Sequence, residues 1–160
     1  MIKITLNASE RVLAMHIACG REENNKRKNF NERKQCDRSG WDINFEGVCG
    51  EIAACKYLKV YPDTEYSVDN PPKHDLITKL GFTVDVKTAD ASKDFWSATI
   101  WKKPEDVDKY LFVRGRFPTY EICGWARSDE YIHPSKLHDV GNGKFYKISM
   151  DEISNMQGEF

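Results

Sequence analysis

The segment that most constrains the fold is a candidate β-hairpin at residues 71–90, PPKHDLITKLGFTVDVKTAD. Residues 74–78 and 82–88 favour strands, which leaves Lys79, Leu80 and Gly81 between them. A three-residue hairpin loop favours glycine at its last, left-handed position, where Gly81 falls. Such a loop is centred on Leu80 and pairs residues whose numbers sum to 160. We therefore expect Asp75 to lie opposite Asp85.

This register predicts a charged patch on an otherwise apolar hairpin. Opposed residues have Cβ atoms ~5 Å apart, and alternation puts Asp85 and Lys87 on one face together with Asp75. Opposed carboxylates cost stability unless a charge neutralises them, and Mg²⁺ prefers carboxylate oxygens. A surface ion pair between Lys87 and one aspartate is the alternative, but it would not explain the paired acids. We favour a site where a metal-activated water attacks a phosphodiester.

A second candidate element, a helix over residues 45–58, supplies a further carboxylate. Its apolar stripe has helical spacing and comprises Phe45, Val48, Ile52 and Cys55. Glu51 projects at the edge of this stripe, whereas Glu46 is expected to point to solvent. Gly47 and Gly50, both poor helix formers, indicate close approach by another backbone or a substrate. A carboxylate in Glu51's position needs a partner, which is either an unidentified Arg or Lys or the metal.

Together these residues resemble the PD-(D/E)xK nuclease superfamily, whose pattern is a helix glutamate, a strand aspartate and then an acid-x-Lys unit. Glu51 in GVCGEIAACKYL, Asp75 in PPKHDLI and residues 85–87 in TVDVKTA match in that order. The likeness covers roughly residues 44–126. His74 rather than proline precedes Asp75, and no QxxxY follows Lys87, which argues against the exonuclease branch.

The resemblance implies an α/β fold, a restriction-endonuclease-like core in which a central mixed β-sheet is flanked by α-helices. It also implies Mg²⁺-dependent cleavage of DNA, with Mn²⁺ as a substitute, by an endodeoxyribonuclease. Asp75, Asp85 and the Val86 carbonyl would hold the metal, with Glu51 directly or through water. Lys87 would orient the water and stabilise the transition state. A homodimer would provide the two sites that a double-strand break needs.

Length and composition are consistent with one domain over residues 1–160, with 40% hydrophobic and 31% charged residues. No segment has the length and apolarity of a membrane span, and residues 1–13 lack the layout of a secretory signal. Five cysteines without a CxxC pair indicate reduced thiols. We therefore expect a cytoplasmic protein that does not associate with membranes, and the small, Lys-rich chain fits a phage or mobile element.

Residues 21–38 form a locally basic segment with a charge of +3 in a chain whose net charge is −1. Such a run is usually a solvated surface, and the alternative is an arm that contacts phosphates. The candidate DNA-binding residues are Lys26, Arg27, Lys28, Arg33, Lys34 and Lys73. Trp96 and Trp101 suggest base stacking, but at least one of them should be in the core. The alternative to an enzyme is a catalytically silent nucleic-acid-binding or assembly module on the same fold.

Overall fold

A computed structural model of the chain describes residues 1–27, 39–65, 72–141 and 143–156. The helices are α1 (Ala8–Arg27), α2 (Gly40–Leu58) and α3 (Ser128–Tyr131). The strands are β1 (Ile2–Thr5), β2 (Leu76–Ile77), β3 (Thr83–Ala89), β4 (Phe95–Thr99), β5 (Lys109–Arg116), β6 (Thr119–Arg127), β7 (Leu137–Asp139) and β8 (Lys144–Ser149). Three short 3₁₀ turns are η1 (Pro104–Asp106), η2 (Pro134–Lys136) and η3 (Met150–Glu152).

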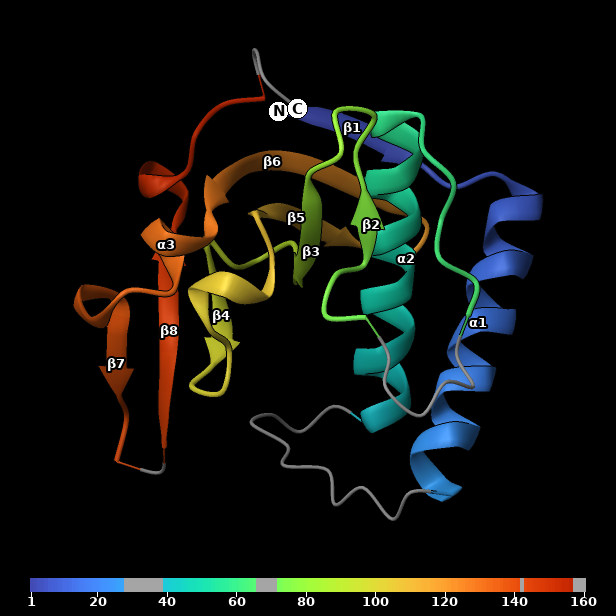
Figure 1. Cartoon of the computed structure of the whole chain (residues 1–160). Coiled ribbons are helices and arrows are strands. Elements are labelled where there is room, and N and C mark those ends of the chain that lie inside the picture. Colours follow the sequence, from blue (N-terminus) through green and yellow to red (C-terminus); the bar gives the residue numbers. More distant parts are fainter. Residues whose placement is uncertain (28–38, 66–71, 142, 157–160) are drawn as a thin grey trace.

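A five-stranded mixed sheet in the order β1-β6-β5-β3-β2 forms the centre of the molecule. β3 and β5 pair in parallel, and the other neighbouring strands pair antiparallel. The predicted α/β class with a central mixed sheet is therefore confirmed. A second, antiparallel sheet in the order β4-β8-β7 lies on the other side of the central sheet from α1 and α2 (Figure 1).

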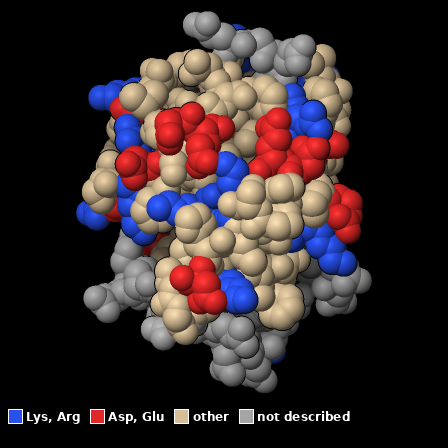
Figure 2. Space-filling model, turned by 90° about the vertical axis from the view of Figure 1, so that its left-hand side faces the viewer, with Lys and Arg blue, Asp and Glu red and all other residues tan. Residues whose placement is uncertain are grey.

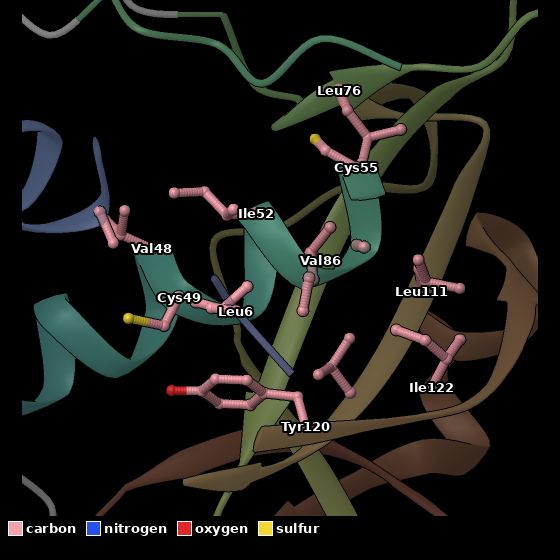
Figure 3. Close-up of a cluster of buried hydrophobic side chains, with 14 of the residues drawn as sticks. Leu6, Val48, Cys49, Ile52, Cys55, Leu76, Val86, Leu111, Tyr120 and Ile122 are labelled. Carbon is pink, nitrogen blue, oxygen red and sulfur yellow. The ribbon is translucent and has the colours of Figure 1, made fainter. Parts of the chain in front are cut away.

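The two faces of the central sheet are covered differently. On one face, α2 packs against buried strand residues that include Val86, Leu111 and Ile122 (Figure 3). On the other face, Tyr110 and Phe112 pack against side chains of β4, β8 and α3. The expectation of flanking helices thus holds for α1 and α2 on one face only. The small sheet and the four-residue helix α3 cover the other face.

Helix α1 begins at a capping box and continues through a glycine. Glu10 N–H donates to Asn7 Oδ1 (2.9 Å), and Asn7 N–H donates to Glu10 Oε2 (2.6 Å). Gly20 does not end the helix, which continues to Arg27, although glycine is a poor helix former. The i,i+4 ion pair between Arg27 and Glu23 (2.7 Å) supports the turns that follow the glycine.

Helix α2 begins at Gly40, five residues before the predicted start, because Ser39 Oγ accepts a hydrogen bond from Asp42 N–H (3.1 Å) as its N-cap. Its end at Leu58 agrees with the prediction. The expectation that Glu46 points to solvent is wrong. The hydroxyl group of the buried Tyr120 donates to Glu46 Oε2 at 2.5 Å. The helical wheel could not show this contact, because the acceptor's partner lies 74 residues away in β6.

Gly50 sets the distance between α2 and β3. A Cβ atom built on Gly50 would lie 1.9 Å from Thr88 Oγ1, whereas one built on Gly47 would meet no atom within 4 Å. The close approach that the sequence suggested at both glycines is therefore found at Gly50, where it is to a side chain of β3, and is wrong for Gly47. This contact holds the adjacent Glu51 beside the strand that carries Asp85 and Lys87.

Among the described residues, no helix combines the length and the apolar character needed to span a bilayer. Cys49, Cys55 and Cys123 are free and buried, and Cys19 is free and exposed. Cys36 lies outside the described residues.

The two glycines of α2 give a matched test of this packing. Gly50→Ala should lower the free energy of unfolding by about 1–3 kcal/mol, because Thr88 must move to admit the new methyl group. Gly47→Ala should raise it by up to ~1 kcal/mol, because alanine is the better helix former and meets nothing there. Urea unfolding of both variants measures the two changes. Equal effects would show that Gly50 does not control the helix–sheet distance.

Candidate active site

The β2–β3 hairpin has the predicted register. Leu76 pairs with Val84 and Ile77 with Thr83, so that each pair sums to 160. Gly81 adopts the left-handed conformation that the loop requires, with φ of 88°. The strand is shorter than expected, however, and begins at Leu76.

Asp75 therefore stands just before β2 and not within it. Its N–H donates to Val84 O at 2.8 Å, and its carboxylate Oδ2 accepts a hydrogen bond from Val86 N–H at 2.6 Å. The carboxylate thus accepts the hydrogen bond that a backbone carbonyl of a neighbouring strand would otherwise accept from β3. The N–H and C=O groups of a strand residue point to the same side, so the Val86 carbonyl also faces the Asp75 side of the strand.

Asp85 is paired with two lysines. The residue is 3% exposed and lies beside Tyr110, its in-register neighbour on β5. Lys87 Nζ forms an ion pair with Asp85 Oδ1, and Lys102 Nζ forms an ion pair with Asp85 Oδ2. The sequence predicted the proximity of Lys87. It gave no role to Lys102, because this contact joins β3 of the central sheet to the turn that follows β4 of the small sheet.

Glu51 has the basic partner that the sequence left unidentified. Arg21 Nη1 and Nη2 donate to Glu51 Oε1 and Oε2, both at 2.8 Å, in a bidentate pair. Such pairs are strong and geometrically specific. Of the two interpretations of Glu51, the ion pair is the one that the structure shows directly. Arg21 belongs to the predicted basic segment, but within α1 it faces α2.

Asp75 is the carboxylate that lacks compensation. Its burial and the nearby charges of Glu51 and Asp85 raise the pKa of Asp75 well above its ordinary value, although Lys87 and the hydrogen bond from Val86 N–H oppose the rise. Among the described residues, no ion pair involves Asp75. The site contains three acids (Glu51, Asp75 and Asp85) and three bases. Arg21 pairs with Glu51, and both lysines pair with Asp85. Asp75 is thus the acid of the site whose negative charge is least balanced by a base.

A layer of aromatic residues closes the site behind Asp85. Tyr110 and Tyr131 are fully buried, and their rings meet edge to face at 4.9 Å between centroids. Burial, and then the charge of Asp85, raises the pKa of Tyr110 well above its usual range, so its hydroxyl group stays protonated. Lys87 Nζ also lies 5.6 Å from the centre of the Tyr110 ring. The ammonium group therefore lies between an aromatic face and a carboxylate.

In front of Asp75 lies an open pocket of about 350 Å³. Its lining residues come from the segment after α2 and from the approach to β2: Val60, Tyr61, Pro62, Asp63, Thr64, His74, Asp75, Leu76 and Ile77. His74, the neighbour of the candidate catalytic aspartate, lies in this pocket, and Tyr61 is 79% exposed at it. The pocket gives a ligand access to the side of the site where Asp75 lies.

The predicted DNA-binding lysines and arginines that the structure describes are all paired with acids. Lys26 pairs with Glu22 (3.5 Å), Arg27 with Glu23 (2.7 Å) and Lys73 with Asp106. Three further candidates lie outside the described residues: Lys28, Arg33 and Lys34. On the side of the molecule that carries the small sheet, basic and acidic side chains are interspersed (Figure 2). This face has no continuous basic surface.

The site offers oxygen donors to a divalent cation, although its acids are not gathered around one point. In the described parts of the chain, no three His, Cys, Asp or Glu side chains approach closely enough to hold a metal ion together. Glu51 is paired with Arg21, just as Asp85 is paired with two lysines, and the role of Glu51 as a ligand, direct or through water, stays a prediction. Asp75, Asp85 and the Val86 carbonyl supply hard oxygen donors of the kind that Mg²⁺ takes together with water. The donor set therefore fits Mg²⁺, provided that Asp85 releases a lysine.

Comparison with known proteins adds no assignment to this geometry. No protein-family model matches the chain, and a search of curated proteins finds no relative. The residues described above are therefore the basis for a functional conclusion.

The raised pKa of Asp75 predicts a specific pH dependence of stability. Between the ordinary value of 3.8 and the higher folded pKa, the folded state binds more protons than the unfolded chain, so stability falls as the pH rises. Asp75→Asn keeps an acceptor for Val86 N–H but lacks this titration. At pH 7.5, relative to pH 4, the variant should gain on the order of 1 kcal/mol over the wild type, or about 2–4 °C in Tm.

Thermal unfolding across this pH range measures the difference, with Asp139→Asn as the control. Asp139 is an exposed carboxylate in β7, and its Oδ2 lies 3.8 Å from Lys144 Nζ. It does not belong to the candidate site. Its variant should follow the wild-type curve. Parallel curves for the wild type and Asp75→Asn would show that Asp75 is an ordinary surface carboxylate.

Proposed function

We propose that the protein is a metal-dependent nuclease that hydrolyses DNA phosphodiester bonds, built on a restriction-endonuclease-like core. One observation carries the proposal: Asp75, a carboxylate without an ion-pair partner among the described residues, lies near the charges of Glu51, Asp85 and Lys87, and Asp85 in turn holds the ammonium groups of Lys87 and Lys102. Such a charge arrangement suits a cation and a phosphate bound together. Mg²⁺ held by Asp75, Asp85 and the Val86 carbonyl would supply the missing positive charge and activate a water for attack on phosphorus.

The two lysines have the position to receive the phosphate. Lys87 and Lys102 are partly exposed, with 22% and 26% of their side chains accessible, while the Asp85 side chain they share is 4% accessible. A phosphodiester offers two anionic oxygens and accepts ammonium groups readily. Substrate binding would therefore draw the lysines from Asp85 to the phosphate and free the Asp85 carboxylate for the cation. In this role Lys87 stabilises the charge that develops on the transferred phosphoryl group.

Glu51 acts on this site through charge and position. Its bond to Arg21 joins α1 to α2, and its negative charge contributes to the raised pKa of Asp75. Glu51 thereby strengthens the preference of Asp75 for a cation without touching the substrate. Arg21, the first residue of the predicted basic segment, fixes Glu51 in this arrangement.

The second candidate function is a nucleic-acid-binding or assembly module that does not cleave. The bidentate pair between Arg21 and Glu51 favours it, because that glutamate is not available as a ligand. The double ion pair of Asp85 favours it as well. The two functions differ in one respect only, which is whether bound DNA is cut.

Divalent cations provide a test that does not depend on activity. Millimolar Mg²⁺ or Mn²⁺ at pH 7.5 should raise the Tm of the wild type by a few degrees, because binding to the folded state alone stabilises it. The rise should be lost in Asp75→Asn and kept in Asp139→Asn. An equal rise in all three proteins would place the cation elsewhere.

Plasmid nicking tests the proposed reaction itself. With Mg²⁺ or Mn²⁺, the wild type should convert supercoiled plasmid to the open-circular form. Asp85→Asn and Lys87→Ala should each lower the rate by about 10²-fold or more, since each removes a group that acts on the developing charge. The matched controls are Asp139→Asn and Lys144→Ala, an exposed acid and base of the β7–β8 hairpin.

Circular dichroism of each variant shows whether it is folded, which matters for Asp85→Asn because it leaves two lysines without their partner. Nicking that persists equally in Lys87→Ala would mean that the activity comes from another protein in the preparation. Binding of the plasmid by the folded wild type without any cleavage would favour the silent module.

A further inference from the structure

Trp101 is an aromatic side chain that the packing of the fold does not use. It is 74% exposed, whereas Trp96, five residues earlier, is 2% exposed and lies in the core beside Phe112. The other two tryptophans, Trp41 and Trp125, pack against the core cluster that contains α2. A tryptophan is a large apolar surface that proteins normally bury to a high degree. The exposure of Trp101 therefore calls for a ligand.

The turn that presents Trp101 is fixed to the candidate active site. Lys102 N–H donates to Thr99 O at 3.1 Å, and Lys103 N–H donates to Asp106 Oδ2 at 2.9 Å. These bonds order the backbone on the C-terminal side of Trp101. The Lys102 ammonium group reaches Asp85, so the tryptophan is one residue away from a group at the site.

A second contact ties the same turn to the approach to β2. Asp106, which accepts from Lys103 N–H, also forms an ion pair with Lys73, two residues before Asp75. The turn is thus connected to both aspartates of the site, to Asp85 through Lys102 and to Asp75 through Lys73 and Asp106. The turn that presents Trp101 is therefore anchored beside the candidate active site.

The chemistry around the ring indicates its ligand. Two lysines follow Trp101 directly in the chain: Lys102 is partly exposed with its ammonium group at Asp85, and Lys103 is exposed. Alternating cationic and aromatic contacts are typical of surfaces that bind single-stranded nucleic acid, where a base stacks on the ring and its phosphates meet the lysines. A paired base in a duplex already stacks on its neighbours and cannot offer its face. The ligand of Trp101 would have to be an unpaired base.

We propose that Trp101 stacks on an unpaired base next to the scissile phosphate, so that the substrate is single-stranded or locally opened DNA. This inference rests on the proposed function and specifies its substrate. A protein partner or a second copy of the chain is the other occupant to consider. The exposed apolar surface at this turn consists of Trp101 and Ile100, the latter 41% exposed, and lysines follow directly. That area is small beside the roughly 800 Å² per partner of a stable interface.

Fluorescence anisotropy of labelled DNA tests the inference separately from cleavage. The probes are an oligothymidylate and a blunt duplex of the same length, measured in EDTA and again with Ca²⁺ in place of Mg²⁺. Trp101→Ala should weaken binding of the oligothymidylate by about tenfold or more and leave duplex binding within about twofold. Trp101→Phe should keep most of the affinity, because it keeps an aromatic face. Trp101→Leu, which is apolar but has no such face, should behave like the alanine variant.

Val140→Ala is the matched control, an exposed apolar residue (64%) beyond β7 that lies apart from the site. It should bind both probes as the wild type does. The inference is overturned if Trp101→Ala binds the oligothymidylate normally, if it loses both probes equally, or if Trp101→Leu retains the affinity. In any of these cases the loss of nicking in Lys87→Ala would still support the nuclease. Failure of the wild type to bind either probe would overturn both proposals.

Discussion

The hydrogen bond from Val86 N–H to the Asp75 carboxylate is the contact on which the candidate site depends. It holds the acid at the end of β2 against the strand that carries Asp85 and Lys87. In that place the carboxylate is half-buried and close to the charges of Glu51 and Asp85, and no base in the described parts of the chain forms an ion pair with it. A hydrogen bond of this kind favours the charged form, while burial and the neighbouring acids favour the neutral one. The site is therefore poised to take up positive charge.

The remaining features of the fold serve to keep that arrangement in place. Gly50 allows α2 to approach Thr88, which places Glu51 beside β3. Arg21 then fixes Glu51 from α1. On the opposite face, the small sheet brings the turn after β4 to Asp85, so that Lys102 reaches it. The helices on one face of the central sheet and the small sheet on the other pack through separate hydrophobic clusters. The helices contribute Arg21 and Glu51 to the site, and the turn after β4 contributes Lys102.

The parts of the site that could be predicted from sequence are those governed by local rules. The glycine in the turn at residues 79–81 determines the hairpin register, and strand alternation places Lys87 next to Asp85. Helical spacing likewise predicted α2 and the position of Glu51 at the edge of its apolar stripe. The nuclease assignment rests on these elements, and it stays a prediction.

The parts that could not be predicted depend on contacts between distant segments. Arg21 and Glu51 are 30 residues apart, and Glu46 meets Tyr120 across 74 residues. Neither partner can be chosen from composition or periodicity, because each segment offers several candidates. The run Trp101-Lys102-Lys103 is a sequence signal that could have marked Lys102 as a candidate site residue. Its approach to Asp85, however, follows from the second sheet, which no local pattern indicates.

Anomalous diffraction from a crystal soaked in Mn²⁺ tests the central claim most directly. The account predicts a peak in contact with the carboxylates of Asp75 and Asp85 and with the Val86 carbonyl oxygen, and a Lys102 ammonium group displaced from Asp85. An empty site in which both lysines still hold Asp85, with manganese bound elsewhere or not at all, would contradict it.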